Sequence, residues 1–286
     1  MLRICTEQDF ETYADFAYGL ALDPSRSGYP TYCDGIKTKE MFVQRAKKAF
    51  ARDTEEILLF ERGGKVEGWI HYYWLPADRY LSTVSFNINA GMEEALAEFL
   101  ALAEERFRGY DLLLGWPGEN QAAAAFLPAH GFACIEEDYN NTAFLETCRE
   151  VPVSGGIVRV TKENDACFRQ LHEKAEGDMY WNADRICADL DQWIIFVRLR
   201  AGEPVGCVYY MDADDGWYEI FGIDTKDGAF DPGLFRELVG AALSEAKRRG
   251  GKYMTFFCGE ESQALAEELG FTPVGRYVCF KKHLGP

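Results

Sequence analysis

The sequence repeats itself at an offset of 138 to 141 residues, and this repeat limits the fold more than any other feature. A period of this size indicates a duplicated domain, whereas solenoids and propellers repeat every 20–50 residues or so. The sequence therefore predicts two related domains, residues 1–149 and 156–286, joined by the Pro- and Gly-containing segment 149–156. Four landmarks keep their order in both copies: Gly68 and Gly206, Arg108-Gly109 and Arg249-Gly250, Gly118-Glu119 and Gly259-Glu260, and Gly131-Phe132 and Gly270-Phe271.

Both copies have the same predicted order of elements: strand, two helices, three strands, helix, strand, helix and two strands. Apolar stripes at helical spacing predict a long helix that ends at Arg108-Gly109 in the first copy and at Arg249-Gly250 in the second. The second of these helices has a start signal in Asp231-Pro232, an N-cap followed by Pro at the first helical position. Further helices are predicted at about 8–20, 38–52, 121–129, 163–175, 182–190 and 262–269, and strands at about 57–60, 66–74, 83–88, 111–115, 133–135, 141–145, 157–160, 193–199, 205–211, 218–223, 253–257 and 273–281.

The chain is strongly acidic, with 30 Lys and Arg against 47 Asp and Glu and a formal net charge of −17. Nucleic-acid binding needs a basic surface, so this balance argues against a nucleic-acid partner. Residues 1–150 carry a net charge of −11 and residues 151–286 one of −6. Two explanations of this acidity stay open: solubility alone, or an acidic groove that attracts a cationic substrate.

Membrane, secretion and metal signals are all missing from the sequence. No segment reaches the roughly 18–20 consecutive apolar residues of a membrane helix, and the charged N-terminus does not fit a secretory signal. The nine cysteines form no C-x-x-C pair and the four histidines no metal pair on one helical face, so no metal site is predicted. We therefore expect a cytoplasmic protein with reduced thiols and no membrane partner, and homo-oligomer formation stays open.

The element order, together with two short motifs in each copy, resembles the GNAT superfamily of acyl-CoA-dependent N-acyltransferases. The matching residues are Val66-Glu67-Gly68 and His130-Gly131-Phe132 in the first copy, and Val205-Gly206 and Leu269-Gly270-Phe271 in the second. The resemblance implies an α/β chain of two tandem GNAT-like domains, each with a mixed, mostly antiparallel sheet flanked by helices. It also implies acetyl-CoA as co-substrate.

GNAT proteins usually carry a Q/R-x-x-G-x-G/A loop before the long helix, whose backbone N–H groups bind the CoA pyrophosphate. The first copy departs from this pattern, because 89–94 holds a single glycine and two glutamates that oppose a diphosphate. We therefore expect the first domain to be non-catalytic. In the second copy, 224–235 is either an ordinary capped helix start or a degenerate CoA loop, in which the cofactor-binding residues would be Lys226, Gly228, Gly233, Leu234 and Phe235.

The resemblance also implies a carboxylate base on the central strand, and Glu219 stands at that position. The first copy has Ser85 or Phe86 in this region, so the active site is assigned to the second domain. Backbone N–H groups of Phe221, Gly222 and Ile223 would hold the thioester carbonyl. A strand glutamate that faces solvent, or that pairs with an arginine, is the alternative reading of Glu219.

The tyrosine that protonates the departing thiolate in many GNAT enzymes is absent, since Leu127 and Ala266 occupy its positions. Tyr209, Tyr210, Tyr277 or water would have to supply that proton. Asn120 matches a family asparagine but is also explained as a helix cap.

Acceptor contacts in the family often come from the two-helix segment, where the second copy carries Tyr180, Trp181 and Asp184. Aromatic and acidic groups together can hold an amine, and inter-domain packing is the alternative role of the two aromatic residues. The sequence thus predicts an N-acetyltransferase that acts on a small cationic or polar amine through its C-terminal domain. The alternative is a non-catalytic GNAT-like binding or sensor protein that has lost CoA binding.

Overall fold

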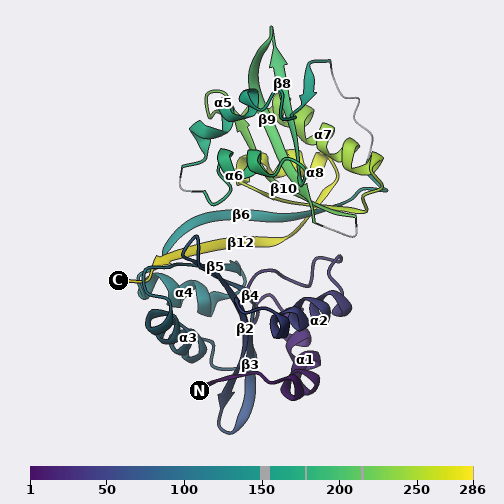
Figure 1. Cartoon of the computed structure of the whole chain (residues 1–286). Helices are drawn as coiled ribbons and strands as arrows, with labels where there is room; N and C mark the ends of the chain where they lie inside the picture. Colours follow the sequence, from purple (N-terminus) through teal and green to yellow (C-terminus); the bar gives the residue numbers. More distant parts are fainter. Residues whose placement is uncertain (149–154, 178, 214–215, 286) are drawn as a thin grey trace. The chain divides into compact units, whose positions relative to one another are not determined.

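A computed structural model of the chain describes residues 1–148, 155–177, 179–213 and 216–285 (Figure 1). The chain forms two compact units, Met1–Asp138 with Gly275–Pro286 and Tyr139–Val274. Each unit has a mixed sheet flanked by helices, which confirms the α/β fold class. Most of the predicted linker, 149–154, lies outside the described residues.

The first unit has a sheet in the order β1-β2-β3-β4-β5-β12. All described neighbours in this sheet are antiparallel except β4 and β5, which run parallel. Its strands are β1 (Leu2–Ile4), β2 (Glu55–Arg62), β3 (Lys65–Leu75), β4 (Tyr80–Ile88), β5 (Asp111–Pro117) and the C-terminal part of β12 (Phe271–His283). Its helices are α1 (Glu7–Ala21), α2 (Lys39–Lys47), the 3-10 helix η1 (Lys48–Ala51), α3 (Met92–Arg106) and α4 (Gln121–Ala129).

The second unit repeats this design in the order β6-β11-β10-β9-β8-β7, with β10 and β11 as the parallel pair. Its strands are the C-terminal part of β6 (Ala133–Phe144), β7 (Ile157–Arg159), β8 (Trp193–Arg200), β9 (Glu203–Asp212), β10 (Trp217–Thr225) and β11 (Tyr253–Cys258). Its helices are α5 (Ala166–Ala175), α6 (Ala183–Ala188), α7 (Pro232–Arg248) and α8 (Glu260–Glu268).

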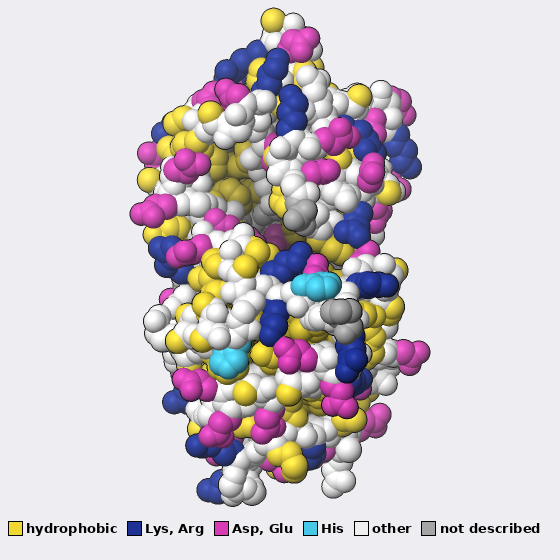
Figure 2. Space-filling model, turned by 90° about the vertical axis from the view of Figure 1, so that its left-hand side faces the viewer, with side chains coloured by type: hydrophobic (Ala, Val, Ile, Leu, Met, Phe, Trp, Pro, Cys, Tyr) yellow, Lys and Arg dark blue, Asp and Glu magenta, His cyan; other side chains and the backbone are white. Residues whose placement is uncertain are grey.

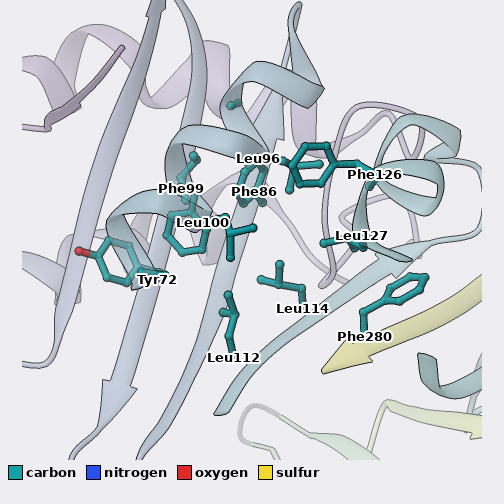
Figure 3. Packing of buried hydrophobic residues seen from close by; sticks show 14 of the residues in the cluster. Tyr72, Phe86, Leu96, Phe99, Leu100, Leu112, Leu114, Phe126, Leu127 and Phe280 are labelled. Atoms are coloured by element: carbon teal, nitrogen blue, oxygen red, sulfur yellow. The ribbon is translucent and has the colours of Figure 1, made fainter. Parts of the chain in front are cut away.

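The two repeats exchange their last strands. Residues 277–283 of β12 pair with β5 in the first unit, and residues 139–144 of β6 pair with β11 in the second. The units therefore differ from the predicted domains 1–149 and 156–286, because the repeat pattern identifies related segments but not the strands with which they pair. Figure 3 shows the result in the first unit, where Phe280 of β12 lies beside Leu114 and Leu127 in the core.

Helices cover both faces of each sheet, because each face is apolar where a helix packs on it. In the second unit, α7 buries Leu234, Leu238 and Val239 on one face, and α5 buries Phe168 and Leu171 on the other. Figure 1 shows α5 and α6 on one side of these strands and α7 on the other. The strands between them, β10 among them, are therefore covered by helices on both sides.

No helix among the described residues combines the length and the apolar character that crossing a membrane requires.

Candidate active site

The central strand of the second unit, β10, contains a β-bulge at Phe221. Ile220 pairs with Tyr210 of β9 and Gly222 pairs with Tyr209, so Phe221 is an extra residue with no partner opposite. A bulge breaks the regular ladder and turns backbone groups and side chains in new directions, and bulges are frequent beside active sites. The bulge residue Phe221 is one of the three strand residues that the sequence predicted as thioester-binding. The other two, Gly222 and Ile223, follow it and pair with β9.

The parallel pairing of β10 with β11 ends next to this bulge. Its last pair is Ile220 with Phe256, although β10 continues to Thr225 and β11 to Cys258. In the part of the chain that the structure describes, no other strand pairs with this edge of β10. Backbone N–H and C=O groups on such an edge need partners, and an extended ligand can supply them. We call this place the strand opening of the second unit.

Glu219 lies two residues before the bulge, on the face covered by α5 and α6. Tyr218 and Ile220 pack into the core under α7, and alternation along a strand places Glu219 and Phe221 on the opposite face. Glu219 is half-buried and lies opposite Met211 of β9 and Thr255 of β11. A carboxylate thus lies on the central strand beside the strand opening.

Tyr209 lies directly against the bulge. A Cβ on Gly222 would overlap the Tyr209 hydroxyl group, so only glycine fits at this position. Tyr209 is 3% exposed, and its ring lies among Phe168, His172 and Trp193. Of the tyrosines proposed as proton donors, Tyr209 has its hydroxyl at the bulge.

Tyr277 is not part of this site. It lies on the part of β12 that pairs with β5 in the first unit, where it contacts Tyr29 and packs over Gly115. Burial raises the pKa of Tyr277 well above its usual value, which makes it a weaker acid. The sequence predicted that Tyr277 lies in the second unit, because the repeat pattern does not indicate which sheet the last strand joins.

A buried ion pair supports the face that carries Glu219, and the sequence analysis did not find it. Nδ1 of His172 lies 2.8 Å from Asp224 Oδ2, and Nε2 lies 2.9 Å from the Trp181 carbonyl oxygen. Both partners present acceptor oxygens, an arrangement that favours the doubly protonated imidazolium form of His172. Burial alone would lower the pKa of His172, but these hydrogen bonds outweigh it and raise the pKa. The available signal was a histidine within the apolar stripe of Phe168 and Leu171.

The segment 226–235 is an ordinary capped helix start. The Asp231 carboxylate accepts hydrogen bonds from the N–H groups of Gly233 and Leu234, at 2.9 and 3.0 Å. The N–H of Phe235 bonds the Asp231 carbonyl, and that of Gly228 bonds Thr225. Lys226 is exposed and lies 3.9 Å from Glu203. The amides proposed to cradle the diphosphate thus already have partners within the chain.

The three proposed acceptor residues differ in their surroundings. Arg185 already covers the ring of Tyr180 at 4.1 Å, and Asp184 forms a 2.7 Å ion pair with Arg169. Trp181 instead packs against Trp193 and Phe221, with ring centroids 5.3 and 6.3 Å away. Trp181 is thus the one of the three whose ring reaches the bulge.

Figure 2 shows the side of the chain on which α5 and α6 lie. In the upper half of this view, which is the second unit, hydrophobic side chains gather around a hollow with charged side chains on its rim. No group of three or more metal-ligating side chains occurs among the described residues.

The comparisons with known proteins agree with this geometry. Residues 157–271, nearly the whole second unit, match the acetyltransferase (GNAT) family. The second unit is thus similar in sequence to GNAT domains. This match confirms the resemblance that the sequence indicated.

Solved GNAT structures resemble the chain over its full length. A GCN5-related N-acetyltransferase from Sphaerobacter thermophilus aligns with 100% of this chain and 96% of its own, at a TM-score of 0.63 and 14% identity. A tandem GNAT protein from the clavulanic acid biosynthesis pathway aligns over 100% and 99%, at a TM-score of 0.57 and 15% identity. At such low identity these similarities show a shared tandem GNAT fold and nothing finer. No curated protein matches the sequence.

The first unit has the GNAT strand arrangement without the carboxylate. Its central strand β4 pairs Thr83 with Tyr72 and Ser85 with His71, so Val84 is the bulge residue. The residue two positions before the bulge, where the second unit has Glu219, is Ser82. The sequence had placed this position at Ser85 or Phe86, three or four residues further along the strand, because the repeat pattern does not fix the alignment of the two strands residue by residue. Either alignment leaves the first unit without a strand carboxylate.

Proposed function

We propose that the second unit transfers an acetyl group from acetyl-CoA to a small cationic or polar amine. The observation that carries this proposal is the bulge at Phe221, with Glu219 two residues before it and the strand opening beside it. A carboxylate, a break in the regular strand pairing and a strand edge that can take an extended ligand therefore lie close together on β10, and this supports the proposal.

The two ends of acetyl-CoA, the arm that bears the thioester and the diphosphate, fit the second unit differently. The arm that bears the thioester is extended and contains amide groups, so it suits the unpaired edge of β10 as an added strand would. The diphosphate does not find the expected cradle, because Asp231 occupies the amides at the start of α7. Nearby cations offer a weaker substitute, among them Arg200, which lies 3.6 Å from Asp231. We therefore expect donor binding that is weaker than a full amide cradle would give.

Glu219 is proposed as the base. An amine attacks only when neutral, so a carboxylate that accepts its proton directly or through water promotes the reaction. The donor supplies an acyl group already activated as a thioester. Backbone N–H groups around the bulge are proposed to stabilise negative charge on its carbonyl oxygen. Tyr209 is proposed as the proton donor for the leaving group, because its hydroxyl lies against Gly222.

The acceptor is proposed to bind on the α5 and α6 side of β10. Trp181 and Phe221 offer apolar and aromatic surface there, and Glu219 offers a negative charge on the same face. An aromatic surface beside a carboxylate favours a cation over an anion. Tyr180 and Asp184 would join such a site only by exchanging Arg185 and Arg169 for the substrate amine.

The test is Glu219→Gln, assayed by CoA thiol release over a panel of polyamines, amino sugars and amino acids. Loss of the base should lower turnover by about 10²-fold or more, with acetyl-CoA affinity in calorimetry kept within about twofold. Glu203→Gln, an exposed strand residue of the same unit, is the matched control and should keep full turnover. Unchanged turnover in Glu219→Gln would remove this residue from the mechanism.

One observation favours the alternative of a non-catalytic binding protein, namely the Asp231 cap that closes the start of α7. Calorimetry on the wild-type chain separates the two functions. Saturable binding of acetyl-CoA supports the transferase, and no binding at millimolar concentration supports the alternative.

A further inference from the structure

The first unit also has a strand opening, and the chain itself fills it. The parallel pairing of β4 with β5 ends at Ser82 and Leu113, although the strands continue to Ile88 and Pro117. Residues 26–29, from the connection between α1 and α2, hydrogen-bond to both separated strands. Their contacts are Ile88 N–H to the Arg26 carbonyl at 2.8 Å, Gly28 N–H to the Phe86 carbonyl at 2.8 Å and Tyr29 N–H to the Gly115 carbonyl at 2.9 Å.

This segment behaves as a short extra strand. Ser27 forms an antiparallel bridge with Asn87, and both residues are fully buried. The Asn120 side chain donates a hydrogen bond to the Ser27 carbonyl at 3.2 Å while its oxygen caps α4 through Ala123. Asn120 is therefore both the helix cap that the sequence predicted and a clamp on the inserted segment.

The fit around Gly28 is close. A Cβ at this position would lie 3.2 Å from the Phe86 Cβ and 3.6 Å from the Gly115 carbonyl oxygen. Side chains larger than hydrogen would press against β4, so the segment approaches the strand through a residue without a side chain. The opening is thus filled at van der Waals contact and leaves no room for a second extended chain at the same backbone groups.

The second unit has a shorter connection between its first two helices than the first unit. Its connection between α5 and α6 spans 176–182, whereas the first unit has 22–38 between α1 and α2. Among the described residues of the second unit, no backbone segment bridges β10 and β11 beyond Ile220 and Phe256. The longer connection is what allows the first unit to close its own opening.

We infer that residues 26–29 are a built-in occupant of the first unit's donor position, so that the chain binds one acyl donor, in the second unit. The identity of this position as a donor site rests on the function proposed above. The start of α3 agrees with the inference, because Glu93 and Glu94 in its first turn oppose a diphosphate.

Hydrogen exchange of the full chain, with and without acetyl-CoA, tests this directly. The amides of Gly28, Tyr29 and Ile88 should exchange at least about 100-fold more slowly than an unstructured chain, and acetyl-CoA should not change them. Acetyl-CoA should instead slow exchange in 221–225, with one equivalent bound per chain in calorimetry. Fast exchange of those three amides, two bound equivalents, or an acetyl-CoA effect on 26–29 would each overturn the inference.

A pair of variants keeps the inference separate from folding. Gly28→Val should speed exchange at Tyr29 and Ile88 by at least tenfold and leave acetyl-CoA affinity unchanged. Gly19→Val, where no atom lies within 4 Å of an added Cβ, is the control and should leave both measurements unchanged. Slow exchange of the three amides without any acetyl-CoA binding would refute the proposed transferase and still support the filled opening. Unaltered exchange in Gly28→Val would count against the filled opening.

Discussion

Asp224 on β10 and His172 on α5 form a buried ion pair, with 2.8 Å between Asp224 Oδ2 and His172 Nδ1. The same imidazolium donates its second proton to the Trp181 carbonyl, so one side chain fastens α5, β10 and the segment before α6 together. Because Asp224 lies three residues after the bulge residue Phe221, the pair connects Trp181 with the strand that carries Glu219. A buried His and Asp pair is retained where two apolar residues would also fill the space, which is reasonable if the pair holds a functional geometry.

This pair makes stability dependent on pH. The pKa of His172 is raised in the folded protein above the usual value of about 6.5 that it has when unfolded, so its stabilising contribution is complete below that pH. The contribution is lost as the pH rises through the raised folded pKa. His172→Gln should therefore lower the free energy of unfolding by about 2–4 kcal/mol at pH 6, and by less at pH 9. Urea unfolding at several pH values measures this difference.

His283 provides the matched control for this prediction. It also pairs with a carboxylate, Asp111, at 2.8 Å, but its side chain is 62% exposed. His283→Gln should cost less than about 1 kcal/mol at every pH, because exposed ion pairs contribute little. A His172→Gln deficit that does not shrink above pH 6.5 would show that the imidazole is not charged in the folded protein.

A second prediction concerns Asp231, whose charge faces the diphosphate expected near α7. Asp231→Asn keeps an N-cap of equal quality and removes the negative charge. Affinity for acetyl-CoA should rise about fivefold at low salt, and the gain should shrink at high salt. Calorimetry at two salt concentrations measures it. Asp227→Asn in the same loop should give a smaller gain, and no gain from Asp231→Asn would place the diphosphate away from α7.

Much of the fold could be predicted from the sequence, because its signals are local. The start of α7 at Asp231-Pro232 and the whole of α4 follow from capping and apolar spacing. Strand pairing is not local in the same way. The last strands of the two copies carry similar patterns, and either could complete either sheet, so the exchange of β6 and β12 could not be predicted.

The position of Glu219 on the central strand could be predicted, because one residue type within a strand pattern carried the signal. Features that depend on tertiary contacts could not be predicted in this way. Lys226 and Gly228 fit a phosphate loop by composition, yet the chain's own carboxylate and carbonyl groups occupy the neighbouring amides. The His172 and Asp224 pair joins residues 52 positions apart, and nothing in the local sequence of either predicts the other.

A third prediction follows from the strand exchange and concerns Phe280. This side chain is 4% exposed and belongs to the core of the first unit, although its sequence belongs to the second repeat (Figure 3). Phe280→Ala should lower the free energy of unfolding by about 3–5 kcal/mol, the usual cost of removing a buried aromatic ring. Phe144→Ala, at a position 38% exposed, should cost clearly less.

Hydrogen exchange locates the effect of Phe280→Ala in one unit. Phe280 pairs with Leu114 on β5, so the variant should speed exchange at Leu112–Leu114. Exchange at Met254–Phe256 on β11, the strand that would be its neighbour without the exchange, should stay unchanged. The opposite result, with faster exchange on β11 and unchanged exchange on β5, would mean that each repeat keeps its own last strand in solution.

A truncation gives a further test of the strand exchange. Removal of residues 275–286 should expose the edge of β5 and cause aggregation, because a strand edge without its partner can pair with other chains.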